Sequence, residues 1–184
     1  MGEKLCSRAQ LLAAAGYPNG FECELACLNF SPWTDVALQI KSDLAQVGIN
    51  VKLNQIDASR LSELIFAREY QMFLWDWLPD YVDPDCNAKA FAHSDSAGDD
   101  ATIKLSAWEA KYVNLETSKL VDQAAQESDN AKRAIIYKQI ADRILEDGPF
   151  AILYTPKKQY GIRLEVRELL GIPSLLWSNF PVLQ

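Results

Sequence analysis

Carboxylate and aromatic side chains gather between positions 75 and 85, where the sequence runs Trp-Asp-Trp-Leu-Pro-Asp-Tyr-Val-Asp-Pro-Asp. Carboxylates at this density can hold a hard cation, or one of them can anchor the ammonium group of a ligand. Asp80 is the candidate anchor, because aromatic rings on both sides of it would supply apolar walls and cation–π contact. Those candidate wall residues are Trp75, Trp77 and Tyr81. Aromatic side chains packing beneath a solvated acidic loop remain the alternative interpretation.

A metal site is the other chemistry that the stretch suggests, but its spacing argues against one. Asp76, Asp80, Asp83 and Asp85 do not have the spacing of a calcium loop, two prolines interrupt them, and no glycine supplies the sharp turn. We therefore predict no metal and no cofactor.

His93 is the single histidine, so a hydrolase with a Ser-His-Asp or Cys-His mechanism would have to use it. It stands among loop serines and aspartates, and the chain has no G-x-S-x-G elbow. Phosphate-binding loops of the G-x-G-x-x-G and G-x-x-x-x-G-K types are also absent from the sequence. We predict a solvated loop histidine and no enzyme; a small hydrolase stays as the alternative.

The composition of the chain excludes some classes of binding partner. The chain has 184 residues, 49% of them hydrophobic, which suffices for a globular core, and a formal charge of −7. This charge, without any Lys/Arg cluster, argues against nucleic acid and anionic membranes. The sequence has no run of about 18 apolar residues, the pattern that would predict a membrane span. Cys23 and Cys27 have an even spacing that places them on one face of a predicted strand, and they are interpreted as core residues. Whether Cys6 and Cys86 pair stays open.

The first half of the chain alternates between two periodicities. A short helix over Ser7–Ala15 and a turn precede a half-buried strand over Phe21–Phe30. Ser31 and Asp57 are predicted to cap two helices, with a strand of alternating apolar residues from Ile49 between them and a third strand over Glu69–Trp75. The order β-α-β-α-β with helical crossovers predicts parallel strands.

After Trp75 the pattern changes to a polar stretch over Asp76–Asp100, which predicts a long loop. Helical spacing returns around Val121 and again after a predicted Asp129 cap, and Gly148-Pro149 ends the second helix. Phe150–Thr155 is continuously apolar and predicts another buried strand. An apolar tail follows over residues 168–184. If this tail were a contact surface, the chain could instead be a protein-interaction domain.

Four stretches, taken in order, resemble the family 5 extracellular solute-binding proteins, the peptide, dipeptide and nickel-binding group of ABC importers. They are Ala9–Phe21, Ile40–Val51, Trp77–Pro84, and Lys132–Tyr137 continued by Ile140 and Pro149–Tyr154. The resemblance implies a mixed α/β lobe of a two-lobed, type II-like periplasmic binding protein, with a mainly parallel sheet flanked by helices. The lobe would cover residues 7–167, and the tail over 168–184 would return to a missing N-terminal lobe.

By the same resemblance, the protein would carry peptides or cationic small solutes to the transmembrane subunits of an ABC permease. It would be periplasmic or extracellular, with a lipid anchor as one form of attachment. The Trp77–Pro84 stretch matches the family's cleft-lining loop, with Asp80 where peptide-binding members hold the α-amino group. The turn from Asn29 to Trp33 should also face the cleft. Thr34 and Asp35 stand where some members place a basic residue for the ligand carboxylate, so recognition of that group is not predicted.

Overall fold

The computed structural model describes residues 10–155 of the chain. They belong to two compact units whose boundary lies between Trp77 and Leu78. We call residues up to 77 the first unit and those from 78 onward the second unit, and describe each by itself. The predicted lobe over 7–167 and the apolar tail over 168–184 both extend beyond the described residues and stay predictions.

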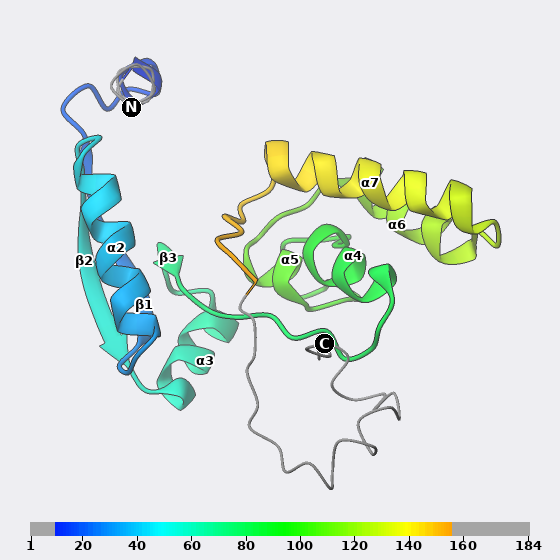
Figure 1. The fold of residues 1–184 in the computed structure, drawn as a ribbon, viewed down its shortest axis with the longest axis horizontal. Helices are drawn as coiled ribbons and strands as arrows, with labels where there is room; N and C mark the ends of the chain where they lie inside the picture. The colour runs from blue at the N-terminus through cyan, green and yellow to red at the C-terminus, as the bar shows by residue number, and fades with distance from the viewer. Residues whose placement is uncertain (1–9, 156–184) are drawn as a thin grey trace, which may run out of the picture. The chain divides into compact units, whose positions relative to one another are not determined.

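The first unit has the predicted β-α-β-α-β order. Its elements are β1 (Phe21–Leu28), α2 (Trp33–Ala45), β2 (Ile49–Ile56), α3 (Ala58–Ala67) and β3 (Met72–Phe73). The sheet has the order β2-β1-β3, and both strand pairs are parallel (Figure 1). The α/β class with helices flanking a parallel sheet is therefore confirmed.

Both faces of the central strand β1 are used. Cys23, Leu25 and Cys27 pack in the cluster that includes Ala37 of α2. The alternate residues Ala26 and Leu28 pack instead with Leu61 and Ile65 of α3. The period of two along a strand thus places the two helices on opposite faces of the sheet. The predicted half-buried strand is corrected in its second half, because residues 25–28 are all buried.

Two glycines allow the start of the β1–β2 pair. Gly20 precedes β1 with φ +75°, and Gly48 precedes β2 with φ +90°. A Cβ at Gly20 would lie 1.8 Å from the Gly48 carbonyl oxygen, so no side chain fits there. Phe21 then pairs with Ile49, and this register continues to the ends of both strands.

Two local predictions in the first unit are wrong. Ser31 does not cap α2: its hydroxyl donates to Asp35 Oδ2 at 2.7 Å, and among the described residues no side chain caps this helix. The third strand is confined to Met72–Phe73 instead of Glu69–Trp75. By contrast, Asp57 caps α3 as predicted, accepting from the Arg60 amide at 3.0 Å.

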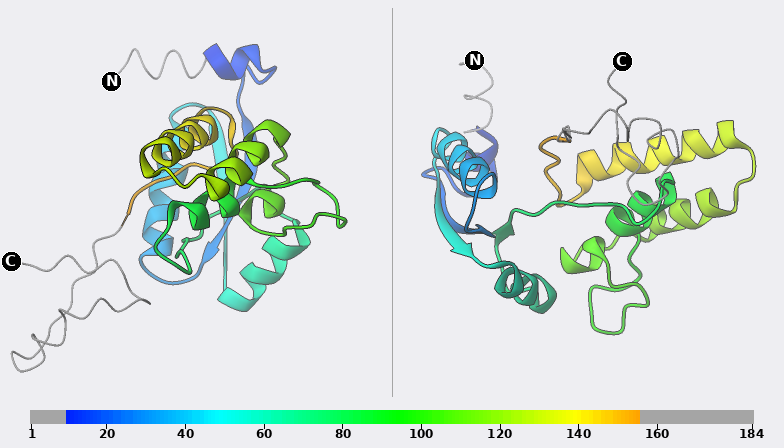
Figure 2. Two further views of the ribbon diagram at one scale, coloured as in Figure 1. Left: turned by 90° about the vertical axis from the view of Figure 1, so that its right-hand side faces the viewer. Right: turned by 60° about the horizontal axis from the view of Figure 1, so that its bottom comes forward.

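The second unit is helical. It contains α4 (Pro84–Ala92), α5 (Ser106–Glu109), α6 (Leu115–Gln126) and α7 (Asn130–Asp147), and α6 and α7 lie side by side (Figure 2). The three longer helices pack through a buried cluster whose members are Ala88, Ala92, Val121, Ala124, Ile136, Ile140 and Ile144. Asp129 caps α7 as predicted, with its Oδ1 accepting from the amides of Ala131 and Lys132. No described helix is long and apolar enough to cross a membrane.

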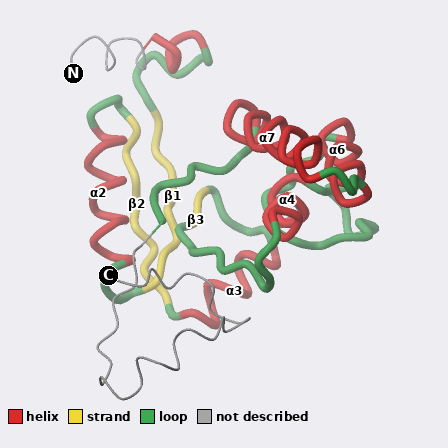
Figure 3. Tube along the Cα trace, turned by 45° about the vertical axis from the view of Figure 1, so that its right-hand side comes forward, coloured by secondary structure: helices red, strands yellow, loops and turns green. Residues whose placement is uncertain are grey.

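Two predictions for the second unit need correction. The supposed loop over Asp76–Asp100 contains α4, which begins at an Asp83 cap followed by Pro84. The predicted strand over Phe150–Thr155 is absent from the described chain, where these residues follow α7 as loop (Figure 3). A strand needs a neighbouring strand for its backbone hydrogen bonds, and apolar character alone does not supply one. Ile152, Leu153 and Tyr154 are exposed.

Candidate functional site

Two tryptophans meet at the carboxyl ends of the strands in the first unit. Trp33 begins α2 after β1, and Trp75 follows β3; their ring centroids lie 6.4 Å apart with planes inclined by 31°. The Leu74 amide donates to the Ala26 carbonyl at 2.9 Å, which holds the chain beside β1 just before Trp75. Trp75 is 40% exposed, so part of this aromatic pair faces solvent. Ligands of open α/β sheets collect at such strand ends.

Asn29 and Trp77 complete the predicted residues of the first unit. Asn29 follows β1 directly, is exposed, and its amide donates to the Ile56 carbonyl at 3.1 Å. Trp77 is half-buried at the end of the unit. The structure therefore brings Trp33 and Trp75 together and places Asn29 at the same end of β1.

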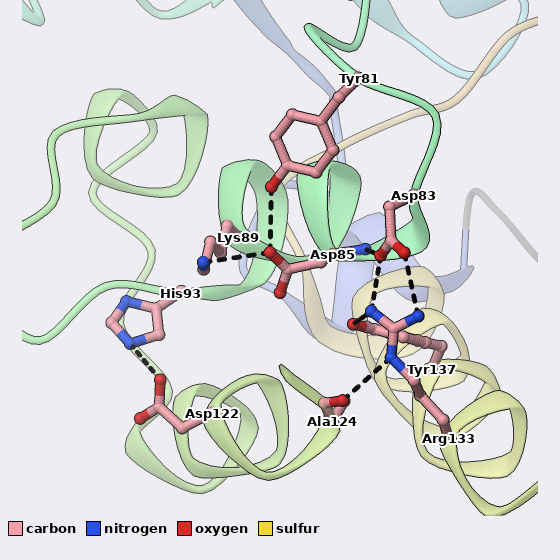
Figure 4. Close-up of polar contacts among 9 residues, drawn as sticks. All are labelled: Tyr81, Asp83, Asp85, Lys89, His93, Asp122, Ala124, Arg133 and Tyr137. Carbon is pink, nitrogen blue, oxygen red and sulfur yellow. Dashed lines mark hydrogen bonds and ion pairs between the residues drawn. The ribbon is translucent and has the colours of Figure 1, made fainter. Parts of the chain in front are cut away.

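Tyr81 and Asp80 belong to the second unit. The Tyr81 hydroxyl donates to Asp85 Oδ2 at 3.0 Å (Figure 4). Because this hydroxyl is shielded from water and donates to a carboxylate, the pKa of Tyr81 is raised to about 12. Asp80 is exposed and makes no hydrogen bond or ion pair with the described residues.

Asp83 is bound on two sides. Arg133 donates from Nη1 to Asp83 Oδ2 at 2.9 Å and from Nη2 to Oδ1 at 2.7 Å, a bidentate pair (Figure 4). The Asp85 amide donates to the same Oδ1 at 2.8 Å, so Asp83 also caps α4. The hydrogen bonds from Arg133 and the Asp85 amide hold the pKa of Asp83 below its ordinary value.

Asp85 is buried in the first turn of α4, yet it has a cationic partner. Lys89 Nζ lies 3.0 Å from its Oδ2, the oxygen that also accepts from Tyr81. The acidic stretch therefore separates into two kinds of carboxylate. Asp83 and Asp85 are neutralised inside the second unit, whereas Asp76 and Asp80 are exposed. Within residues 10–155, no group of three or more His, Cys, Asp or Glu side chains could hold a metal ion.

His93 is not the solvated loop residue that the sequence predicts. It follows the last turn of α4, and its side chain is only 12% exposed. Its Nε2 lies 3.3 Å from Asp122 Oδ1 of α6 (Figure 4). The unexpected helix α4 accounts for this burial, because it packs against α6 and carries His93 with it.

Cys23 and Cys27 lie in the core of the first unit, as predicted. Cys23, Cys27 and Cys86 are buried free thiols, and burial raises the pKa of Cys23 and Cys27. Raised pKa values disfavour the thiolate, the nucleophilic form. Cys6 lies outside the described residues.

Arg133 and Tyr137 are the polar residues near the acidic stretch whose roles the sequence did not indicate. Arg133 Nη2 donates to the Tyr137 hydroxyl at 3.0 Å, and its Nε donates to the Ala124 carbonyl at 3.1 Å. Burial is the main cause that raises the pKa of Tyr137. Helical spacing of four relates Arg133 to Tyr137. Arg133 also pairs with Asp83, which lies fifty positions earlier, and a single sequence contains no pattern that predicts this contact.

Comparison with protein families matches residues 7–99 to the middle part of the bacterial extracellular solute-binding proteins, family 5. Among curated proteins, the chain is 26% identical over 143 residues to the probable D,D-dipeptide-binding periplasmic protein of Escherichia coli (strain K12), covering 78% of this chain and 27% of that protein. It is 28% identical over 112 residues to a di/tripeptide-binding protein of Pseudomonas aeruginosa (strain UCBPP-PA14), covering 61% and 20%. The chain thus spans about a quarter of the length of these curated relatives.

Solved structures show the same likeness. A periplasmic binding protein from Helicobacter pylori, in complex with the peptide STSA, has a TM-score of 0.67 and 26% identity, covering 76% of this chain and 26% of that one. A binding protein from A. tumefacien R10 in complex with agropinic acid has a TM-score of 0.64 and 30% identity, covering 74% and 27%.

Proposed function

The chain belongs to the bacterial extracellular solute-binding proteins of family 5, and on that basis we propose that it forms part of the solute-binding component of an ABC importer. This component would capture a peptide or a related small solute outside the cytoplasm and deliver it to the transmembrane permease. It would act in the periplasm or at the cell surface, where a lipid anchor would hold it. Because the chain spans only about a quarter of its curated relatives, it would supply one part of the ligand cleft.

One observation carries the assignment of the ligand anchor. Asp80 is exposed and makes no bond to another described residue, whereas its neighbours Asp83 and Asp85 are paired with Arg133 and Lys89. A carboxylate without an internal cation is available for the ammonium group of a ligand, with which it forms a charge-assisted hydrogen bond. We therefore assign Asp80 as the residue that holds the ligand's cationic group.

The aromatic side chains are assigned as apolar contacts, each on its own unit. In the first unit these are Trp33, Trp75 and Trp77, with Asn29 as a polar contact at the end of β1. In the second unit Tyr81 has this role. The partly exposed rings of Trp33 and Trp75 offer an apolar surface of the kind that ligand sites use.

Names of relatives support a cargo with amino-acid character. One is a probable D,D-dipeptide-binding protein, another is a di/tripeptide-binding protein, and a solved structure contains the peptide STSA. A further solved structure contains agropinic acid. We propose a peptide or a small solute with an ammonium group for this chain.

We propose no catalytic role for the protein. The family is one of binding proteins, and the alternative hydrolase would need His93 as its base. His93 Nε2 faces Asp122, and the imidazole is largely buried. A protein-interaction domain that uses the tail over 168–184 remains the other alternative, because the tail lies outside the described residues.

Replacing Asp80 by asparagine tests the anchor directly. The change keeps the size of the side chain and removes its charge, so affinity for a peptide with a free amino terminus should fall about tenfold or more. N-acetylated forms of the same peptides should be affected little. Calorimetry on a solute-binding protein that contains the whole chain measures both affinities. Asp76→Asn is the matched control, since it removes an exposed charge from the same stretch.

Each result has a defined reading. Unchanged affinity after Asp80→Asn would exclude Asp80 as the anchor, and an equal loss after Asp76→Asn would reduce the effect to net charge. Failure of peptides and amino-acid derivatives to bind at all would contradict the proposed cargo class. The 184-residue chain alone should bind weakly, because part of a cleft leaves most of a ligand exposed.

A further inference from the structure

We propose that Arg133 is a positioning residue for the ligand loop, the segment Leu78–Asp83 that carries Asp80. This inference rests on the proposed function, since it concerns the residue that would hold the ligand. Arg133 lies on α7, far from Asp80 in the sequence, and it acts on the loop through Asp83.

The guanidinium group is a fixed point in the helical unit. Its Nε donates to the backbone carbonyl of Ala124, a buried residue of α6, at 3.1 Å. Its Nη2 donates to the Tyr137 hydroxyl at 3.0 Å, and its Cζ lies 5.0 Å from the centre of the Tyr137 ring. The orientation of Arg133 is therefore set by α6 and α7 independently of Asp83.

Arg133 transfers this fixed orientation to the end of the ligand loop. Its two terminal nitrogens bind both oxygens of Asp83 at 2.9 and 2.7 Å, which specifies the plane of the carboxylate as well as its place. Asp83 also caps α4 through the Asp85 amide. Arg133 thus joins the last residue of the loop to α6 and α7, while Asp83 itself caps α4 (Figure 4).

Two further bonds extend this order back toward Asp80. The Asp83 amide donates to the Tyr81 carbonyl at 3.1 Å, which closes a tight turn. The Tyr81 hydroxyl donates to Asp85 Oδ2, and Lys89 holds that carboxylate from the next turn of α4. Asp80 is preceded by Pro79, whose ring fixes its own φ. Asp80 makes no bond to the described residues itself, so the bonded residues Tyr81 and Asp83 that follow it set its position.

We call the bidentate contact between Arg133 and Asp83 the clamp. Amide hydrogen exchange on the 184-residue chain tests it without any ligand. Three amides report on it, because each donates to an acceptor within the ligand loop or at its end: Asp83, Asp85 and Cys86. Arg133→Gln should accelerate their exchange about tenfold or more, since it removes hydrogen bonds to a charged group. Arg133→Lys should have a smaller effect of the same sign, because it keeps the charge and loses the planar fork.

Arg143→Gln is the matched control. Arg143 lies on the same helix and pairs with Glu116 of α6 at 3.4 Å, away from the ligand loop. Its loss should leave the three reporter amides unchanged. The clamp is overturned if Arg133→Gln leaves the reporter amides at the wild-type rate, or if Arg143→Gln accelerates them equally. Where Arg133→Gln weakens the whole unit, Arg133→Lys decides by the same comparison.

Ligand binding tests the positioning role separately. In a solute-binding protein that contains the chain, Arg133→Lys should lower affinity for peptides with a free amino terminus more than for their N-acetylated forms. If the reporter amides exchange faster but the affinity and the preference for a free amino terminus are unchanged, the positioning role is overturned, while Asp80 stays the proposed anchor. A wild-type protein without preference for the free amino terminus would instead contradict the proposed anchor, and the exchange experiment would still decide the clamp.

Discussion

The two units differ in what lies in their interiors. In the first unit the buried residues are apolar, and polar backbone groups are satisfied by the parallel pairing of β1 with β2 and β3. In the second unit, helices pack through alanine and isoleucine, and polar groups are buried among them. Every residue between 10 and 155 that is both polar and buried belongs to the second unit: Asp85, Ser94, Thr117 and Ser118.

Two of these buried polar residues, Ser94 and Ser118, bind each other. The Ser94 amide donates to Ser118 Oγ at 3.2 Å, and the Ser118 hydroxyl donates back to the Ser94 carbonyl at 3.1 Å. This reciprocal pair joins the chain after α4 to α6. The first unit is therefore specified by a hydrophobic pattern, whereas the second depends on individual polar bonds. The proposed ligand anchor and its clamp lie in the second kind of structure.

The largest effect is expected from the apolar core of the first unit. Leu61 of α3 is fully buried against Ala26 and Leu28 of β1. Leu61→Ala should lower the free energy of unfolding by about 2–5 kcal/mol, through lost burial and the cavity that remains. Urea unfolding of the chain measures this change. Phe66→Ala on the same helix is the control: its side chain is 61% exposed, and the expected change is about 0.5 kcal/mol or less.

A loss of similar size in both variants would show that the sheet–helix core does not dominate the stability of the first unit. A loss for Leu61→Ala well below 2 kcal/mol would have the same meaning, unless the neighbouring side chains close the cavity.

A smaller effect is expected from the polar interior of the second unit. Ser118→Ala removes both bonds to Ser94 and leaves a buried amide and a buried carbonyl without these partners. The cost should be about 1–3 kcal/mol, which is the range for buried polar groups left unsatisfied. Protection of the Ser94 amide from hydrogen exchange reports the change. Ser128→Ala, at an exposed position after α6, should leave that protection unaltered. If both variants lowered the protection equally, the second unit would not depend on the buried bonds of Ser118.

Hydrophobic periodicity predicts the first unit because its interior follows that periodicity. Alternation along β1 and β2, glycines before both strands, and the Asp57 cap were enough to predict the order and the parallel pairing. The fourth strand failed for a related reason. The apolar run over Phe150–Thr155 satisfies the same pattern, but no pattern shows whether a neighbouring strand is present to bind it.

The second unit was harder to predict because its decisive contacts join distant positions. A local signal for α4 did exist, since Asp83 followed by Pro84 is a typical helix start. The density of Asp and Pro obscured it, and without α4 the burial of His93 could not be foreseen. The bond between Asp83 and Arg133 crosses fifty positions and leaves no trace in a single sequence.

The smallest effect is expected when acid protonates Asp83, because only the stability that the clamp contributes to the second unit should then be lost. The pKa of Asp83 is lowered by Arg133 and the Asp85 amide. A carboxyl group with a lowered folded-state pKa contributes stability above its ordinary pKa of about 3.9, and this contribution is lost as pH falls through the folded value. The Asp83 side chain is 34% exposed, so screening by solvent keeps this contribution to stability small. Near neutral pH the wild type should therefore unfold at a slightly higher urea concentration than Asp83→Asn.

This difference should shrink as the pH falls below about 4, because protonation of Asp83 removes the charge that the asparagine lacks. Asp142→Asn on α7 is the control, since its pair with Lys138 is exposed on both sides and should add little at any pH. A wild-type advantage that persists in strong acid would show that the charge of Asp83 is not what Arg133 recognises. Hydrogen bonds to a neutral side chain would then explain the clamp, and Arg133→Lys, which keeps the charge but loses the planar fork, would weaken it about as much as Arg133→Gln does.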